Sequence, residues 1–236
     1  MIVTHGCGGI GGAELGWPRE LEAVGIASFV IDGFEGRGVE NACRGAQGVN
    51  QASLLVDLYR AADMLADHPY VDDSKIVVMG FSMGGRSALW SAMERFQERY
   101  DGRPLAAHAA FYPLGCYVQL EAETDVVGGP IRIFHGVADD WLPIAQCEDY
   151  VDRLGAGGVD INLFAYEDAL HGFDDRGLTR DIGVIGALSP RNCRVVETNG
   201  VLTETTAGEP STVNASCIER GATIGYSSSS CSPKES

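Results

Sequence analysis

The chain has 236 residues, 45% of them hydrophobic, and a formal net charge of −16 at pH 7. This length and apolar content suit one large folded domain, and they exclude wholesale disorder or a fibrous repeat. No apolar run approaches the roughly 18 residues of a membrane helix, and the acidic charge disfavours nucleic acid and anionic membranes as partners. We therefore expect a soluble, acidic globular protein.

The acidic charge is concentrated in one part of the chain. Residues 1–182 carry 13 basic and 28 acidic side chains, whereas residues 183–236 carry 4 and 5. The second segment is rich in Ser, Thr and Gly, a composition that disfavours tight packing. We predict a compact catalytic domain over 1–182 and a polar, partly irregular extension over 183–236 that packs on it.

Cysteine is frequent, with seven residues at Cys7, Cys43, Cys116, Cys147, Cys193, Cys217 and Cys231. No C-x-x-C pair is present, so the spacing of a zinc site is missing and we expect no metal. The first residues lack the basic and apolar segments of a signal peptide, which favours the cytoplasm. The cysteine content leaves a periplasmic or secreted location open, because disulfides form there.

Apolar runs alternate with segments of helical period along the chain. Strands are predicted at residues 2–3, 27–31, 75–79, 105–111, 131–134 and 161–165. Helices are predicted at residues 18–24, at 50–65, from the turn at 80–85 to about 95, and at 144–154. This alternation predicts an α/β fold with a mainly parallel sheet covered by helices on both faces.

The motif Gly80-x-Ser82-x-Gly84 lies between a predicted buried strand and a predicted helix. A nucleophilic serine needs a sharp turn at the carboxyl edge of a sheet, and flanking glycines let strand and helix pack closely. An ordinary strand-to-helix turn is the alternative. In this context the motif predicts Ser82 as a catalytic nucleophile.

A serine nucleophile requires a histidine base and a carboxylate that orients it, in the chain order Ser, Asp, His for this kind of fold. His171 follows the last predicted strand, in a glycine-containing loop, and is the predicted base. Asp139 is the predicted orienting carboxylate, with its neighbour Asp140 as the alternative. Both loops follow carboxyl ends of strands, on the same edge as Ser82.

The other four histidines have structural explanations. His5 precedes a glycine-rich turn and His135 directly follows a strand, so each is expected to be a hydrogen-bonded structural histidine. His68 ends a predicted helix, where a cation suits the helix dipole, and His108 lies within a strand.

Ester or amide hydrolysis also needs backbone N–H donors for the oxyanion of the tetrahedral intermediate. One predicted donor is Met83, directly after the nucleophile, and the other is Cys7, in the loop after the first strand. A dinucleotide-binding turn is the alternative for Gly6, Gly8 and position 11. That alternative requires a helix to open there, and Pro18 delays the predicted helix.

These residues together resemble the dienelactone hydrolase family of α/β-hydrolases. The resemblance is carried by His5–Gly9, Gly80–Gly85, Gly136–Pro143 and His171–Phe173. It implies the α/β-hydrolase fold and places the catalytic acid four residues before the proline, at Asp139. The family nucleophile is usually a cysteine, so Ser82 favours a general carboxylesterase over a hydrolase of dienelactone itself.

Two further departures concern the ends of the domain. Family members begin with one or two additional strands, so we expect an N-terminally shortened sheet whose edge a second subunit could close. The closing helix expected after Phe173 is missing. A disulfide between Cys193 and Cys217 could staple the extension instead, and Cys43 could pair with Cys147; the sequence alone fixes neither pairing.

The resulting hypothesis is a serine carboxylesterase that hydrolyses small or short-acyl esters without a cofactor. Trp141, beside Asp139, is a candidate to line the substrate pocket. The expected partner is a small ester, with a homodimer possible. Hydrolysis of an enol-lactone is one alternative, and a non-catalytic binding protein with the same fold is another.

Overall fold

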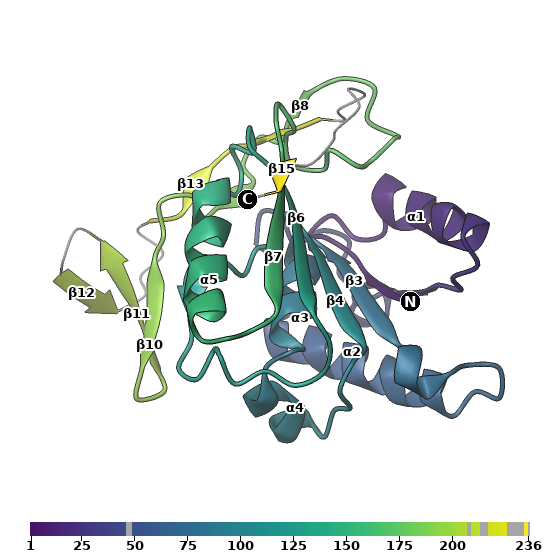
Figure 1. Cartoon of the computed structure of the whole chain (residues 1–236). Helices are drawn as coiled ribbons and strands as arrows, with labels where there is room; N and C mark the ends of the chain where they lie inside the picture. Colours follow the sequence, from purple (N-terminus) through teal and green to yellow (C-terminus); the bar gives the residue numbers. More distant parts are fainter. Residues whose placement is uncertain (46–48, 207–208, 213–216, 226–233, 236) are drawn as a thin grey trace.

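The computed structural model describes residues 1–45, 49–206, 209–212, 217–225 and 234–235. It contains a central sheet of seven strands in the order β15-β7-β6-β4-β3-β1-β2 (Figure 1). All neighbours pair in parallel except β15, which is antiparallel to β7. The strands are β1 (Ile2–Thr4), β2 (Phe29–Ile31), β3 (Val77–Phe81), β4 (Ala107–Phe111), β6 (Ile131–Gly136), β7 (Ile161–Tyr166) and β15 (Lys234–Glu235).

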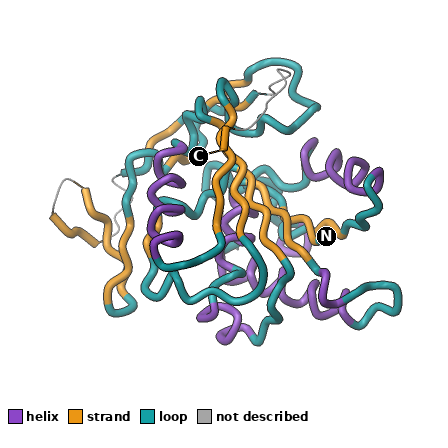
Figure 2. Tube along the Cα trace, in the orientation of Figure 1, coloured by secondary structure: helices purple, strands orange, loops and turns teal. Residues whose placement is uncertain are grey.

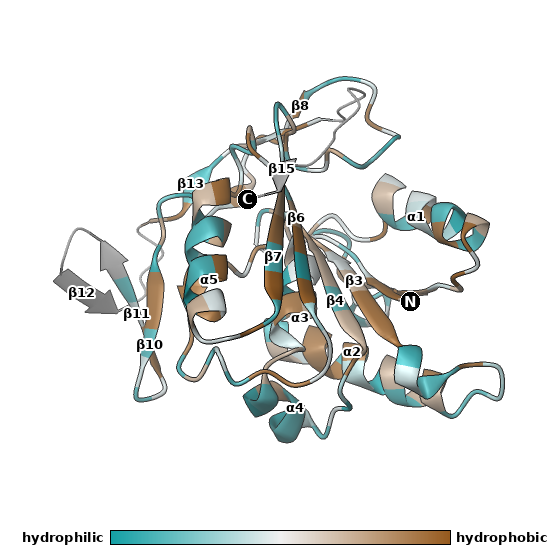
Figure 3. Cartoon of the chain, in the orientation of Figure 1, coloured by the Kyte–Doolittle hydropathy of each residue, from teal (hydrophilic) through white to brown (hydrophobic). Residues whose placement is uncertain are grey.

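Helices cover both faces of this sheet, as the alternation of elements predicts. One apolar core joins one face of the sheet to α2 (Gln51–Ala66), α3 (Met83–Trp90) and α5 (Ile144–Ala156). A second core joins the opposite face to α1 (Gly12–Ala23) and to the loop that contains Phe173. Figure 1 shows α1 and α5 on opposite sides of the sheet, and Figure 3 shows apolar residues concentrated on the central strands. A three-layer α/β architecture results.

Helix α1 starts earlier than the sequence indicates. We predict a helix over 18–24, but α1 runs from Gly12 to Ala23 with Pro18 inside it. The carboxylate of Glu14 accepts the N–H groups of Gly6 (3.1 Å) and Gly11 (2.9 Å), so it stabilises the helix start. Proline here removes a single backbone hydrogen bond.

Two other predicted elements differ from the structure. The strand predicted at 27–31 is shorter and lies at the sheet edge, where Phe29 is 36% exposed, so it is not a buried strand. The helix predicted to about residue 95 divides into α3 and α4 (Glu94–Tyr100). A tight turn separates them because Glu94 donates its N–H to Asp125 instead of continuing α3.

The segment after residue 182 forms short strands around the domain. Strands β10 (Val195–Thr198), β11 (Val201–Thr206) and β12 (Glu209–Thr212) form a sheet with β5 (Val118–Gln119). Two small ladders pair β9 (Leu188–Ser189) with β13 (Glu219–Arg220), and β8 (Ile182–Gly183) with β14 (Thr223–Ile224). The tube in Figure 2 shows these segments as strands joined by long loops. The extension is therefore linked to the body through β5.

Two one-turn 3₁₀ helices, Glu35–Arg37 and Asp73–Lys75, complete the regular structure of the described residues. No helix among them is long and apolar enough to cross a bilayer.

Three disulfides join Cys7 to Cys43, Cys116 to Cys147 and Cys193 to Cys217. The suggested Cys193–Cys217 pairing is confirmed, and the suggested Cys43–Cys147 pairing is wrong. Cys147 on α5 meets Cys116 instead, whereas Cys43 lies against the loop after β1. Cys231 lies outside the described residues.

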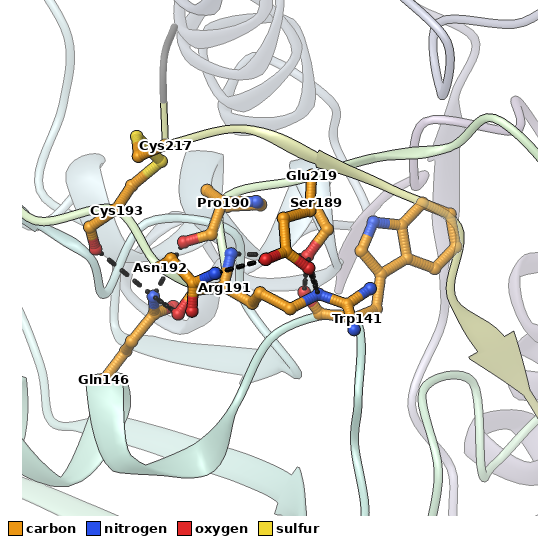
Figure 4. The surroundings of a disulfide bond; sticks show 9 residues. All are labelled: Trp141, Gln146, Ser189, Pro190, Arg191, Asn192, Cys193, Cys217 and Glu219. Atoms are coloured by element: carbon orange, nitrogen blue, oxygen red, sulfur yellow. Dashed lines mark hydrogen bonds and ion pairs between the residues drawn. A yellow bond between two sulfur atoms is a disulfide. The ribbon is translucent and has the colours of Figure 1, made fainter.

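The Cys193–Cys217 bridge joins two segments of the extension, and residues near it form hydrogen bonds to the body (Figure 4). Gln146 on α5 donates to the carbonyls of Pro190 (2.9 Å) and Arg191 (3.3 Å), and Ser189 donates to the carbonyl of Trp141 (2.7 Å). The extension thus lies directly against the loop that follows β6.

Candidate active site

Ser82 stands on a sharp turn between β3 and α3. Its backbone has φ 51° and ψ −106°, a strained conformation for a residue with a side chain. A Cβ at Gly80 would lie 2.1 Å from the carbonyl oxygen of Gly84, and a Cβ at Gly84 would lie 2.4 Å from that of Thr4. Only glycine allows this close packing of strand and helix, which is the requirement inferred from the motif.

Hydrogen bonds on both sides hold the strained turn. The N–H of Ser82 donates to the carbonyl of Phe111 (2.9 Å), and the carbonyl of Ser82 accepts from Arg86 (3.1 Å) and Leu114 (2.9 Å). The surrounding structure therefore fixes the Ser82 conformation, and the side chain projects at the carboxyl end of β3.

The structure joins His171 to Asp139. The imidazole Nδ1 lies 2.8 Å from Oδ2 of Asp139, and both side chains are buried, each residue being 4% exposed. Oδ1 of Asp139 accepts the backbone N–H groups of Trp141 (2.9 Å) and Leu142 (2.8 Å). With both oxygens engaged, Asp139 is held in one orientation and fixes that of His171.

The electrostatics of this pair favour an ionised carboxylate. Burial by itself raises the pKa of Asp139, but the positive charge and hydrogen bond of His171, together with His135 and the N–H of Leu142, hold the pKa below its ordinary value. Asp140 points elsewhere, with its carboxylate on the N–H (2.8 Å) and hydroxyl (3.0 Å) of Thr223. Of the two neighbouring aspartates, only Asp139 contacts the imidazole.

Aromatic rings enclose the His171 imidazole. The ring centroid of Tyr112 lies 4.5 Å from that of His171, and the ring of Trp141 lies 4.8 Å from it. The indole N–H of Trp141 donates to the carbonyl of Leu188 (3.0 Å), which fixes this ring against the extension. The two rings pack against the imidazole and limit its rotation about the bond to Asp139.

Two cavities meet at Ser82. The first, of about 280 Å³, contains Ser82 and His171 on its walls, together with Tyr112, Glu14 and Ile224. The second, of about 220 Å³, is mostly apolar, and Met83, Leu114 and Leu188 are among its lining residues. Ser82, Cys7, Cys43 and Trp141 line both cavities. Trp141 therefore lies where the sequence places a pocket residue.

The predicted oxyanion donors are available at this junction. Among the described residues, neither the N–H of Cys7 nor that of Met83 has a hydrogen-bond acceptor. The loop that carries Cys7 approaches Ser82 closely, since a Cβ at Gly6 would lie 3.6 Å from Cβ of Ser82. Free N–H groups beside a serine are suited to a developing oxyanion.

The same loop argues against a dinucleotide site, although for a different reason than the one the sequence offers. Helix α1 does open directly after Gly11, so the expectation that Pro18 delays it is wrong. However, the carboxylate of Glu14 occupies the N–H groups of Gly6 and Gly11 that a phosphate would require. An anion would have to displace this buried carboxylate.

Within the part of the chain that is described, no hydrogen bond joins the Ser82 hydroxyl to His171, although both face the first cavity. Such bonds commonly tighten only when substrate is bound. Ser82 as a whole residue is 6% exposed, so its hydroxyl is accessible mainly from the cavities.

The remaining histidines have the structural surroundings expected of them where the structure gives contacts. His5 lies 2.7 Å from the carbonyl of Gly6 and accepts the N–H of Gly33 (3.0 Å). His135 is fully buried beside the carbonyl of Gly136, and burial lowers its pKa. His108 bonds to Ser91 within the core.

Sequence reasoning misses Tyr112 and the buried group behind it. The Tyr112 hydroxyl donates to Asp174 (2.7 Å), which also accepts the indole N–H of Trp17 (2.6 Å), and burial raises the pKa of Asp174 to about 6. No motif marks Tyr112, which follows β4 with a positive φ of 35°.

Among the described residues, no cluster of potential metal ligands is present.

The fold and this arrangement define the chain as a protein of the α/β-hydrolase class. A family model described as the dienelactone hydrolase family matches residues 39–187, which is more than half of the chain. The chain therefore belongs to the dienelactone hydrolase family.

Solved structures with low sequence identity share the fold. They include a dienelactone hydrolase-like promiscuous phosphotriesterase from metagenomic libraries, 21% identical, with a TM-score of 0.61 and 73% of this chain and 71% of that chain covered. A thermophilic esterase from Thermogutta terrifontis is 20% identical, with a TM-score of 0.57 and coverage of 75% and 73%. A carboxylesterase from Lactobacillus plantarum is 18% identical, with a TM-score of 0.54 and coverage of 73% of each chain.

A curated relative extends well beyond this chain. "Probable dipeptidyl-aminopeptidase B" from Grosmannia clavigera is 28% identical over an alignment of 162 residues, and the match covers 58% of this chain. The matched region is 16% of the length of that relative.

Proposed function

We propose that the chain is a serine carboxylesterase in which Ser82, His171 and Asp139 form the catalytic triad. The observation that carries this proposal is the 2.8 Å bond from His171 to Asp139 beside a cavity that Ser82 also lines. A serine on a strained turn, next to an imidazole that a buried carboxylate orients, is the arrangement of nucleophilic acyl transfer.

In the first half of the reaction, Oγ of Ser82 attacks the ester carbonyl and Nε2 of His171 takes its proton. The Nδ1–H of His171 donates to Asp139, and the low pKa of this carboxyl keeps a negative charge beside the imidazolium. The N–H groups of Cys7 and Met83 stabilise the oxyanion. Collapse of the tetrahedral intermediate releases the alcohol, which takes the proton from His171.

In the second half, water replaces the alcohol. His171 removes a proton from the water as it attacks the acyl-enzyme, and a second tetrahedral intermediate forms at the same oxyanion donors. Its collapse frees the acid and returns the proton to Ser82. Each step uses the same imidazole, alternately as base and as acid.

The size of the two cavities supports small or short-acyl esters as substrates. Volumes of about 280 and 220 Å³ on the two sides of Ser82 suit one small group each, since pockets for drug-sized ligands reach several hundred Å³ or more. We also place the protein in an oxidising compartment, outside the cytoplasm, because three disulfides are rare in cytosolic proteins.

Labelling with a fluorophosphonate probe tests the nucleophile. Wild-type protein is expected to bind one probe per chain, and Ser82→Ala none. Ser87→Ala is the matched control, because Ser87 lies in α3, the helix that follows Ser82, and lines neither of the two cavities at Ser82. Absent labelling of the wild type, or equal labelling of Ser82→Ala, contradicts the proposal.

A substrate panel tests the substrate class. p-Nitrophenyl esters from acetate to decanoate are expected to show the highest kcat/KM for the short acyl chains. An enol-lactone assayed in parallel tests the alternative that membership of the family suggests. Faster turnover of the lactone than of every simple ester would replace the carboxylesterase assignment.

A further inference from the structure

We infer that Cys43 is a positioning residue, whose disulfide to Cys7 holds the Cys7 oxyanion donor against the nucleophile. The inference rests on the proposed esterase function and adds a residue to it. The bond joins the loop after β1 to the segment around residues 41–45, and both of its cysteines line the two cavities that meet at Ser82.

The loop that carries the Cys7 donor has few other attachments. Its backbone forms a hydrogen bond from Gly9 to Gly6 (3.2 Å) and one from Ala42 to the Cys7 carbonyl (2.8 Å). On either side of Cys7, Glu14 accepts the N–H groups of Gly6 and Gly11, and the His5 ring lies on the Gly6 carbonyl. Gly8 and Gly9 carry no side chain that could pack and restrain the residues directly after Cys7. The disulfide is the covalent restraint on this loop.

The other end of the bridge is well anchored. The N–H of Cys43 donates to the Asn41 side chain (2.9 Å), and its carbonyl accepts the N–H of Leu188 from the extension (2.8 Å). Cys7 and Cys43 both pack against the apolar cluster that contains Trp141 and Leu142. Cys43 thus transmits the position of a fixed segment to the Cys7 backbone.

The contribution of this restraint is expected in the transition state. An oxyanion donor binds the tetrahedral intermediate more strongly than the ground-state carbonyl, so displacement of Cys7 lowers kcat and leaves KM nearly unchanged. Removal of one donor in a comparable site costs about 10²–10³-fold in kcat. Loosening Cys7 without removing it is expected to cost about 10- to 100-fold.

The other two disulfides provide the comparison. Cys116, Cys147, Cys193 and Cys217 are buried and line neither of the cavities at Ser82. A double variant, Cys116→Ala with Cys147→Ala, removes a bridge of similar loop length, 31 residues against 36. It therefore reproduces the entropic destabilisation without touching the oxyanion loop.

The experiment compares Cys43→Ala with that double variant and the wild type, by steady-state kinetics and by inhibition with a trifluoromethyl ketone, which forms a tetrahedral adduct on serine. Cys43→Ala is expected to lose kcat and to weaken inhibition by a similar factor, with KM within about twofold of wild type. The double variant is expected to keep both values. Equal kcat in Cys43→Ala and wild type, or equal losses in the two variants, overturns the inference.

A second measurement covers a Cys43→Ala protein that does not fold. Folded wild type is treated with a dithiol, which reduces the bridge to two thiols and is itself oxidised to a cyclic disulfide. Opening of each bridge is followed by alkylation and peptide mapping. Loss of activity is expected to track the Cys7–Cys43 bridge and to reverse on reoxidation; full activity after this bridge has opened overturns the inference. An inactive, unlabelled wild type would instead contradict the proposed function.

Discussion

Asp139 and Asp140 are neighbours with the same side chain, and the fold gives them different partners. Asp139 is buried against His171, whereas Asp140 binds Thr223 in the extension. At the scale of single residues, the proposed triad therefore depends on which of the two carboxylates the loop after β6 directs toward His171. The two backbone N–H groups that bind Asp139 determine this orientation.

Substitution of each aspartate by asparagine tests this division. Asp139→Asn is expected to lower kcat by about 10³- to 10⁴-fold, because the amide no longer holds the required imidazole tautomer or stabilises the imidazolium. Asp140→Asn is expected to change kcat by less than about threefold. Steady-state hydrolysis of p-nitrophenyl acetate measures both values, and equal losses in the two variants would contradict the assignment.

His108 predicts a pH dependence of stability at the same scale. Burial in the core lowers its pKa to about 4, from the ordinary histidine value of 6.5. Below pH 6.5, His108 therefore binds a proton in the unfolded chain but not in the folded chain. The contribution of neutral, buried His108 to the free energy of unfolding is complete above pH 6.5 and is lost as the pH falls toward 4. The loss reaches about 3 kcal/mol.

Urea unfolding at pH 7 and at pH 4.5 measures this effect. The free energy of unfolding of the wild type is expected to fall more between the two pH values than that of His108→Gln, since all other groups are shared. The same decrease in both proteins would show that His108 does not carry it.

At the scale of elements, the close approach of α3 to β3 and β1 determines the sharp turn on which Ser82 stands. The carbonyls of Thr4 and His5 lie against the backbone of Gly84, so the helix start contacts the first strand without any intervening side chain. The glycines of the Gly80-x-Ser82-x-Gly84 motif are therefore required for packing, whatever the chemistry of Ser82.

An alanine at Gly84 tests the packing requirement. Gly84→Ala is expected to lower the free energy of unfolding by about 3 kcal/mol or more, because its Cβ meets the rigid backbone of β1. Gly16→Ala in α1 is the control, since a Cβ there meets nothing within 4 Å, and it is expected to gain roughly 0.5–1 kcal/mol from helix propensity. Chemical denaturation measures both, and a neutral Gly84→Ala would contradict the packing argument.

Much of the site can be predicted from local sequence, and the remainder depends on contacts distant in the chain. Ser82 lies between a strand and a helix that its own neighbours encode, and His171 follows from chain order. The partner of Cys43 and the ring of Tyr112 against His171 arise only when separate segments meet. The start of α1 is missed because the stabilising bond from Glu14 reaches back to Gly6, eight residues away.

At the scale of the whole molecule, the extension lines both of the cavities that meet at Ser82. Leu188 lines only the second of the two cavities, and Ile224 lines only the first. The proposed triad belongs to the body, which also forms most of the cavity walls, and the extension completes those walls.

Truncation of each wall residue tests which cavity holds the acyl group. One of the two variants, Leu188→Ala or Ile224→Ala, is expected to shift the preferred acyl chain toward longer acids, and the other to shift the preferred alcohol, because each enlarges a single cavity. Two ester series, one varied in the acid and one in the alcohol, measure the shifts. Identical profiles for both variants and wild type would show that these walls do not contact substrate.

The central sheet has two unlike edges. At one edge β15 pairs with Phe164 and Ala165 of β7, so part of the backbone there is already occupied. At the other, β2 offers only three residues, with Phe29 partly exposed. An incoming strand finds few free backbone groups at either edge, which protects the sheet from edge-to-edge aggregation.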